Sequence, residues 1–401
     1  MGGGVTHPSE SRGCARSALA WVGLGRLWLR PAVVCHSGCV VRMSVGIGTS
    51  AAGAPKRRGQ AGAPGPTGVS TGRSDTGAVV SDRAAGAGVP AAAAPGSVPS
   101  SDTEAPGASA SPVLGALRAV AVDERVRAAE AAVREACAEL RWNEALRRRW
   151  REARAEAAIR GAIASGGVEG AVVPAEVLRE HVAEGSLTEA ATGDPGLDAV
   201  AGLWRAGTRL VGWMPDLIGR GRPVVPPARS LLAVLHRDVV GPLAAGGRVA
   251  LEEVGVPRSG RVGAREGGPG TEPQGEELAA RLAGLVELIE VERAPALVRA
   301  AIVHAEMLAA RPFTAGNAAV GRLLVRHLLV RDGVEPTGTA VSDLYPGRVP
   351  VAYAEAAGAY ASGTMEGVVA WVVWQAEAVL AGVQEAQRLC RAVQAGTWRA
   401  G

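Results

Sequence analysis

Apolar residues recur at helical spacing along most of the chain after residue 120. The stretch 120–164 is rich in Ala, Glu, Arg and Leu, contains no proline, and places Val126, Val133 and Leu140 on one helical face. Alternation typical of strands is nearly absent, so the sequence predicts an all-α domain. The other predicted helices are 174–183, 198–210, 228–239, 276–290, 295–310, 318–330, 351–361 and 367–382.

One stretch departs from the helical pattern. From Gly246 to Pro257, the apolar residues Val249, Leu251 and Val254 lie between glycines and a proline, which favours a short β-hairpin. The following segment, 259–275, is rich in glycine, and we expect an exposed and mobile loop there.

The N-terminal part of the chain is different in composition. From Met43 to about Pro112 the residues are mostly Ala, Gly, Pro, Ser and Thr, and such a segment buries too little apolar surface to offset the entropy of ordering. We expect a disordered arm over 1–112, in which Met43 is an alternative start. The expected organisation is this arm, then N-terminal helices over 120–170, then a helical core over 171–390.

Charge and cysteine content name no partner. The formal net charge is only +4 and aromatic residues make up 3% of the chain, which argues against nucleic-acid binding. The five cysteines form no CxxC pair, so neither a disulfide framework nor a zinc site is expected.

Arg26 and Arg30 interrupt the apolar stretch 18–41, and the apolar stretch Val368–Val383 is too short to span a bilayer. We therefore expect a cytoplasmic protein without a membrane partner.

The segment from Arg311 to Arg322 has the features of an anion site. A Pro-Phe pair ends one predicted helix, and Gly316 and Asn317 lie at the start of the next. The first N–H groups of that helix are free and its dipole is positive there, which suits phosphate, and Arg322 lies one turn further on. The alternative is an ordinary corner between two helices, with Phe313 in the core and Arg322 in solvent.

The same segment, extended back to His304, resembles the signature of the Fic family, usually written HPFxDGNGRxxR. His304 matches a histidine often found on the preceding helix. The positions that stand where the family has them are Pro312, Phe313, Gly316, Asn317 and Arg322. The resemblance implies a Fic (Fido) helical domain in which the hairpin over 246–257 is the flap that docks the target, and it implies a protein AMP transferase or a relative of one.

A second match lies upstream of the loop. Ser165 to Gly170 reads Ser-Gly-Gly-Val-Glu-Gly, which is similar to the inhibitory pattern (S/T)xxxE(G/N) of the same family. The resemblance implies that Ser165 and Glu169 belong to a built-in inhibitory motif, in which Glu169 pairs with Arg322. We therefore predict a salt bridge between Glu169 and Arg322.

Several loop positions depart from the family signature. Arg311 stands where the family has its catalytic histidine, and a guanidinium stays protonated, so it cannot be a general base. Ala315 replaces the acidic residue that holds magnesium, and a methyl group binds no hard cation. Ala318 and Ala319 replace Gly-Arg, which removes one phosphate-binding arginine. No catalytic residue and no metal ligand are therefore expected in the motif, and Gly316, Asn317 and Arg322 remain as the nucleotide-binding candidates.

Three functions fit these observations. The first is a catalytically impaired Fic-type protein that binds ATP or another nucleotide, or a protein partner, and the resemblance admits a homodimer. The second is an active transferase with altered phosphate chemistry, which we expect only if a histidine or carboxylate such as His236 or Asp238 faces the loop. The third is a structural interaction module. Asp343 and Glu306, the nearest other acidic residues, are expected to be ordinary surface or capping residues.

Overall fold

The chain is helical throughout the part that the structure describes. The computed structural model describes residues 111–259 and 261–397, and within these ranges it contains thirteen α-helices, one short 3₁₀ helix and no β-strand. The elements are α2 Pro112–Ala121, α3 Glu124–Leu140, α4 Glu144–Arg148, α5 Trp150–Val168, α6 Ala175–Glu184, α7 Pro195–Trp213, α8 Ala228–Ala245, η1 Leu251–Glu253, α9 Gly275–Glu290, α10 Ala296–Ala310, α11 Asn317–Arg331, α12 Leu344–Arg348, α13 Pro350–Ala361 and α14 Met365–Ala395. The predicted all-α class is confirmed.

Short polar side chains fix where several helices begin. Asp123 accepts a hydrogen bond from the backbone N–H of Arg125, and Asn143 accepts one from the N–H of Ala145. Asp194 and Thr364 do the same at the starts of α7 and α14. Each cap satisfies an N–H group that has no partner inside the helix, so these boundaries follow directly from the local sequence.

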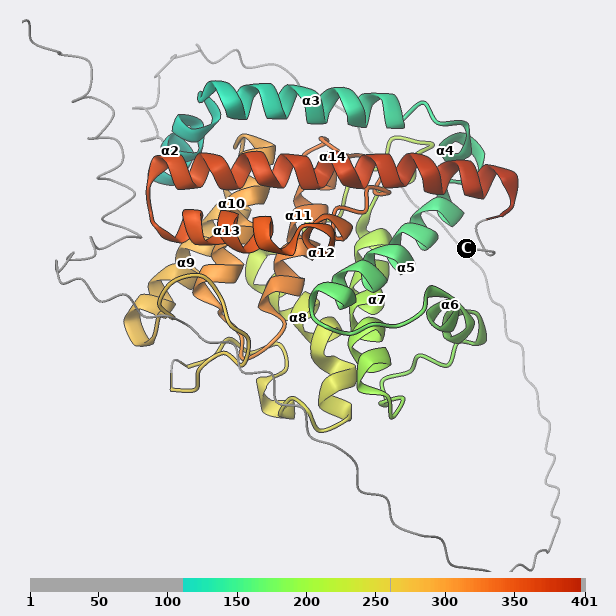
Figure 1. Cartoon of the computed structure of the whole chain (residues 1–401), viewed down its shortest axis with the longest axis horizontal. Helices are drawn as coiled ribbons and strands as arrows, with labels where there is room; N and C mark the ends of the chain where they lie inside the picture. The colour runs from blue at the N-terminus through green and yellow to red at the C-terminus, as the bar shows by residue number, and fades with distance from the viewer. Residues whose placement is uncertain (1–110, 260, 398–401) are drawn as a thin grey trace, which may run out of the picture. The chain divides into compact units, whose positions relative to one another are not determined.

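The core is centred on α10 and α11, which pack side by side. Every residue of α10 except Ile302 is buried, which explains why apolar residues lie on all sides of this helix, with Arg299, His304 and Glu306 as its buried polar residues. The long helix α14 lies alongside α3 and in front of α10 and α11 (Figure 1), and it packs against α10 and α13 as well. On the other side of the core, α7 packs between α5 and α8.

A close crossing joins α7 to α8. An ideal Cβ placed on Gly202 would lie 2.0 Å from the carbonyl oxygen of Val239. No side chain fits at that distance, so the glycine allows the two helix backbones to touch.

The predicted hairpin over 246–257 is wrong. This segment contains the 3₁₀ helix η1, in which the N–H of Val254 donates to the carbonyl of Leu251 at 3.2 Å. The N–H of Gly255 donates to Nδ1 of His236 at 2.8 Å. The N–H groups of Val254 and Gly255 are thus bound to a carbonyl within the turn and to a side chain of α8. They are not available to hydrogen-bond to a second strand.

The predicted boundaries of the N-terminal region also need correction. The first described helix, α2, begins at Pro112, so the helical region starts before residue 120. The expected arm, apart from its last two residues, lies outside the described residues, as do Met43 and Cys35.

Helix α14 is longer than the sequence pattern predicts. It runs for 31 residues, and by length and composition alone it could cross a membrane. However, 67% of its most apolar window is buried inside the fold. Packing against the other helices therefore accounts for its apolar composition.

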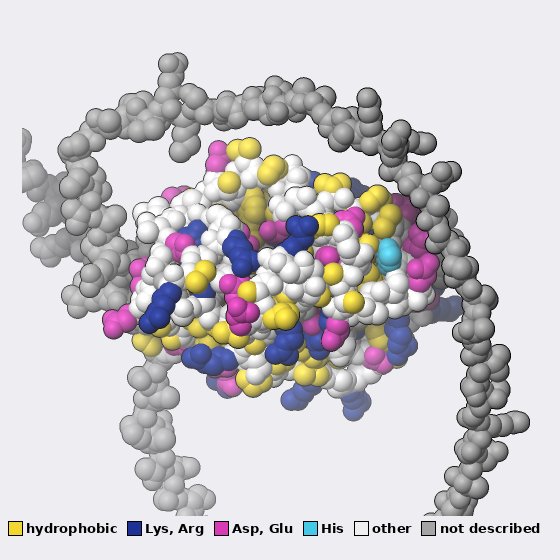
Figure 2. All heavy atoms as spheres, turned by 90° about the horizontal axis from the view of Figure 1, so that it is seen from below, with side chains coloured by type: hydrophobic (Ala, Val, Ile, Leu, Met, Phe, Trp, Pro, Cys, Tyr) yellow, Lys and Arg dark blue, Asp and Glu magenta, His cyan; other side chains and the backbone are white. Residues whose placement is uncertain are grey.

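The surface carries mixed charge. Figure 2 shows arginine and acidic side chains interspersed over one face, with scattered apolar groups between them. Several surface charges of the described residues form pairs, such as Arg134 with Glu130 and Arg151 with Asp216. Exposed pairs of this kind add little to stability.

Candidate functional site

The loop between α10 and α11 is held in shape by its own polar groups. Its last residue, Asn317, closes it on both sides, because Oδ1 accepts from the N–H of Phe313 at 2.8 Å and Nδ2 donates to the Phe313 carbonyl at 2.9 Å. Gly316 adopts a left-handed conformation with φ of 74°, and a Cβ there would lie 3.1 Å from Val240. Only glycine meets both conditions without strain, which explains the Gly-Asn turn.

His236 of α8 packs against this loop and hydrogen-bonds to it. Its ring stacks on Phe313 with centroids 3.9 Å apart and planes 8° from parallel. Nδ1 accepts from Gly255, so Nε2 carries the proton and donates to the carbonyl of Ala315 at 3.1 Å. Burial lowers the pKa of His236 to about 4. Because its only lone pair is already used, His236 cannot act as a base towards a substrate.

Asp238 cannot replace the missing general base either. Its carboxylate accepts from Arg209, with Nη2 2.9 Å from Oδ1 and a second contact through Nε. His236 and Asp238 were the two residues whose position could favour an active enzyme. His236 reaches the loop but has no free lone pair, and the carboxylate of Asp238 is bound to Arg209 of α7.

The start of α11 binds an anion, and that anion comes from the chain itself. The N–H of Asn317 donates to Glu266 Oε1 at 2.6 Å, and the N–H of Gly316 donates to Oε2 at 3.1 Å. The side-chain amide of Asn317 donates to the same carboxylate. Burial and the neighbouring carboxylate of Glu169 raise the pKa of Glu266. The helix terminus therefore holds a carboxylate where the sequence predicts a phosphate.

Sequence reasoning missed Glu266 because it lies in the glycine-rich loop that we expected to be exposed and mobile. In the structure this loop packs on the motif. The N–H of Arg265 donates to the Thr314 carbonyl at 2.7 Å, and Nε of Arg258 donates to the Arg311 carbonyl at 2.6 Å. The only signal in the sequence is the Arg-Glu pair between Gly263 and Gly267.

Arg311 is buried at the end of α10. It has a left-handed φ of 45°, and Gly268 covers it so closely that a Cβ at Gly268 would lie 2.5 Å from the Arg311 Nη1 atom. Within the described ranges, Nε of Arg311 has no hydrogen-bond acceptor and its guanidinium forms no ion pair. Nη1 of Arg258 and Nη1 of Arg322 are likewise buried without an acceptor there. The surroundings of the loop therefore hold unused cationic donors.

The predicted salt bridge between Glu169 and Arg322 is confirmed. Nη2 of Arg322 lies 2.6 Å from Oε1 of Glu169, and Nε donates to Ser165 Oγ at 2.9 Å. Ser165 is on the last turn of α5 and Glu169 directly follows that helix, so the motif Ser165–Glu169 meets α11 from the side. The guanidinium is 3% exposed, whereas the Glu169 side chain is 31% exposed.

Further polar groups surround Arg322. Asp343 Oδ1 lies 3.9 Å from its Nε. Burial raises the pKa of Tyr353 on α13, and the charge of Arg322 opposes this rise. The Tyr353 hydroxyl is also 3.1 Å from Nε2 of His304. Burial lowers the pKa of His304 to about 3, so this histidine is a neutral partner in the core.

Asp343 and Glu306 are both buried, so neither is the surface residue that the sequence suggested. Asp343 occupies the N-cap position of α12, but its side chain makes no capping hydrogen bond there. Burial raises the pKa of Asp343, which lies between Arg322 and Arg326. Glu306 is buried on α10, beside Tyr360 of α13. Their partners come from distant segments, which helical periodicity does not reveal.

Three positions of the motif carry no group that could bind a metal ion. Ala315, Ala318 and Ala319 present only methyl groups. In residues 111–259 and 261–397, no three His, Cys, Asp or Glu side chains gather in a way that suits a metal ion.

Solved structures of known proteins resemble this chain, whereas no family model matches it and no curated protein matches it either. A Fic family protein from Desulfovibrio desulfuricans G20 is similar, with 20% identity, a TM-score of 0.49, and coverage of 64% of this chain and 74% of that one. The chain is similar in structure to Fic family proteins. A fragment of Fic-1 from C. elegans is similar with 20% identity and a TM-score of 0.46, over 69% of this chain and 81% of that one. A variant of this Fic-1 fragment has a TM-score of 0.45 at the same identity, over 69% of this chain and 82% of that one.

Proposed function

We propose that this chain is a Fic-type protein with impaired transferase chemistry, which acts by binding a nucleotide or a protein partner at the loop that precedes α11. The observation that carries the proposal is the carboxylate of Glu266 on the backbone N–H groups of Gly316 and Asn317. A carboxylate and a phosphate oxygen bind a helix N-terminus for the same reason, namely free N–H donors and a favourable dipole.

The proposed loss of transferase activity follows from the residues that occupy two positions of the loop. The position of the family base holds Arg311, and the position of the magnesium ligand holds Ala315. General base catalysis contributes about 10²- to 10⁴-fold in rate, and metal assistance contributes several kcal/mol more. Since His236 and Asp238 are engaged elsewhere, neither of them restores a base. Binding is the property that the remaining residues support.

Two carboxylates of the chain compete with an incoming phosphate. Glu266 occupies the backbone donors, and Glu169 occupies Arg322. A phosphate must displace the first and compete with the second. Removal of either carboxylate should therefore strengthen binding, because it frees donors and removes like-charge repulsion.

The test is calorimetric titration of ATP into the full chain, with and without Mg²⁺. The variants are Glu169→Gly and Glu266→Gln, and the matched control is Glu252→Gln, which changes an exposed carboxylate on η1. We expect at least tenfold tighter binding in both site variants, no change in the control, and little effect of Mg²⁺. If no nucleotide binds to the wild type or to either variant, the nucleotide part of the proposal is wrong, and a protein partner remains as the ligand of the loop.

The second candidate is an active transferase with altered phosphate chemistry. The observation in its favour is the set of buried donors on Arg311, Arg258 and Arg322 that have no acceptor among the described residues. Incubation of the Glu266→Gln variant with ATP labelled on the α-phosphate tests this candidate. Transfer of label to protein without Mg²⁺ supports it, and absence of transfer despite measurable ATP binding excludes it.

A further inference from the structure

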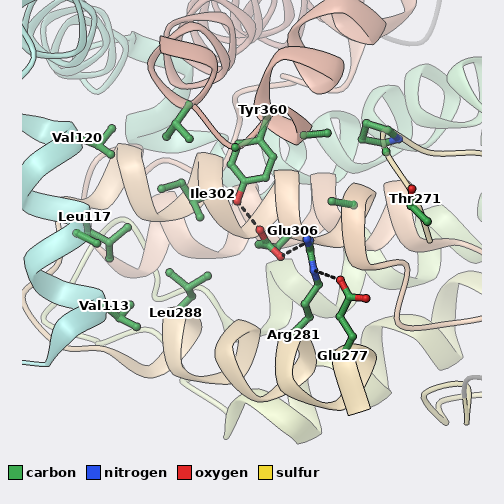
Figure 3. Close-up of a pocket in the computed structure, with 17 residues that line it drawn as sticks. Val113, Leu117, Val120, Thr271, Glu277, Arg281, Leu288, Ile302, Glu306 and Tyr360 are labelled. Atoms are coloured by element: carbon green, nitrogen blue, oxygen red, sulfur yellow. Dashed lines mark hydrogen bonds and ion pairs between the residues drawn. The ribbon is translucent and has the colours of Figure 1, made fainter. Parts of the chain in front are cut away.

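A second site lies on the opposite face of α10. A partly open cavity of about 200 Å³ is lined by residues of α2, α9, α10 and α13, by Val368 of α14 and by the loop residues 269–271 (Figure 3). On α10, Ile302, Glu306 and Ala309 line this cavity, whereas His304 and Met307 face Gly321 of α11. The cavity is therefore separate from the loop that precedes α11, and a ligand in it is independent of the function proposed for that loop.

One end of the cavity is polar and buried. Glu306 is 4% exposed, and its Oε1 accepts from the Tyr360 hydroxyl at 2.5 Å. Its Oε2 lies 3.4 Å from Nη1 of Arg281, at the limit of a hydrogen bond. Nε of Arg281 has no acceptor within the described part of the chain, since Glu277 Oε1 is 3.9 Å away. Among the described residues, each Glu306 oxygen therefore has one partner at most, although a carboxylate has about four lone-pair sites.

The buried charges of this cluster are the carboxylate of Glu306 and the guanidinium of Arg281. The carboxylate of Glu277, 3.9 Å from Arg281, belongs to a side chain that is 66% exposed, so solvent screens it. Burial raises the pKa of Glu306, and Arg281 and the Tyr360 hydroxyl only partly oppose this rise. A cation bound next to Glu306 would supply partners that its ionised form lacks, whereas an anion bound there would add repulsion in a poorly solvated space.

The rest of the cavity is apolar. Figure 3 shows Val113, Leu117 and Val120 of α2 facing Leu288 of α9 and Ile302 of α10. A cavity of about 150 Å³ in another protein holds benzene, so this volume accommodates one ring with a short chain, or about 8 to 10 non-hydrogen atoms. A ligand that fits therefore has a compact apolar body and one cationic end.

We propose that this cavity binds a small primary amine with an aromatic or branched aliphatic body, with the ammonium group on Glu306 and the body against α2. The ammonium donates to the unused lone pairs of the carboxylate in a charge-assisted bond. Tyr360 and Arg281 hold the carboxylate in place.

The probe is 2-phenylethylamine, titrated by calorimetry into the full chain. Its neutral and anionic counterparts, 2-phenylethanol and phenylacetate, have nearly the same size and separate the charge from the shape. We expect the amine to bind at least tenfold more tightly than the alcohol, and the carboxylate to bind most weakly. Stronger binding of phenylacetate would show that Arg281 selects an anion, and this result would overturn the proposal.

Two variants locate the binding. Glu306→Gln keeps the size of the side chain and should weaken amine binding at least tenfold, with the alcohol unaffected and with Glu139→Gln on the exposed face of α3 as control. Ala116→Phe fills the cavity from α2 and should abolish binding of both ligands, whereas Ala119→Phe on the same helix, outside the lining, should not. Equal amine affinity in wild type, Glu306→Gln and Ala116→Phe, or no binding of any probe at millimolar concentration, would refute the proposal.

Discussion

The guanidinium of Arg322 donates to the carboxylate of Glu169 at 2.6 Å, although 153 residues separate the two in sequence. The contact joins the end of α5 to the first turns of α11, and it does so beside the anion that Gly316 and Asn317 hold. Because Arg322 is buried and Glu169 is partly exposed, the two partners do not respond alike to substitution.

Replacement of Glu169 by glutamine should lower the free energy of unfolding by about 1–3 kcal/mol, because a neutral amide replaces a charged acceptor for a buried guanidinium. Urea denaturation at neutral pH measures the change. The variant Glu139→Gln, which alters an exposed side chain on α3, should stay within about 0.5 kcal/mol of wild type. Equal stability of all three proteins would mean that Ser165 and Asp343 alone satisfy Arg322.

The crossing of α7 and α8 predicts opposite effects for two glycines on one helix. Gly202→Ala should destabilise the protein by more than about 2 kcal/mol, since the added methyl meets the Val239 carbonyl. Gly212→Ala should stabilise it by about 0.5–1 kcal/mol, because no heavy atom of the described residues lies within 4 Å of the new Cβ and alanine favours the helix. Thermal unfolding of both variants checks the pair, and a shift of the same sign in both would contradict the crossing geometry.

His327 predicts a pH-dependent difference between two proteins. Burial lowers its pKa from 6.5 to about 4, so below pH 6.5 the unfolded state binds a proton that the folded state excludes until about pH 4. The stability that the neutral histidine contributes is present above pH 6.5 and is lost as the pH falls towards 4. The variant His327→Leu has no imidazole at this position, so it does not lose this stability as the pH falls.

Relative to wild type, His327→Leu should therefore gain about 2 kcal/mol between pH 7 and pH 5. Urea denaturation of both proteins at the two pH values measures it. The buried carboxylates, such as Glu335, whose pKa is also shifted by burial, are common to both proteins and cancel in the difference. If the difference in free energy of unfolding between the two proteins does not change with pH, His327 binds its proton equally well in the folded and unfolded states, and the prediction is wrong.

The sequence predicted the helices and the turn before α11 because both depend on local patterns. Caps such as Asp123 and the Gly316-Asn317 pair act within a few residues, and their signals can be read directly. The contact of Glu169 with Arg322 was predictable only through the resemblance to a known motif, since 153 residues separate its partners.

The residues that the sequence did not reveal have long-range partners without periodicity. Glu266 reaches α11 from a glycine-rich loop, and nothing in the order of residues says where such a loop packs. The hairpin prediction failed for a related reason: the donors of Gly255 and Val254 find other acceptors, one of them on His236. Short apolar runs between glycines cannot by themselves distinguish a strand from a turn.

The long helix α14 also sets the order in which the protein can be completed during synthesis. It packs against α2, α3, α4, α5, α10, α12 and α13, so the apolar surface that each of these helices buries against α14 stays uncovered until residues 365–395 leave the ribosome. A nascent chain in this state exposes surface that aggregates or recruits chaperones. Translation that stops before Met365 would therefore release a chain with most of its helices and no finished core.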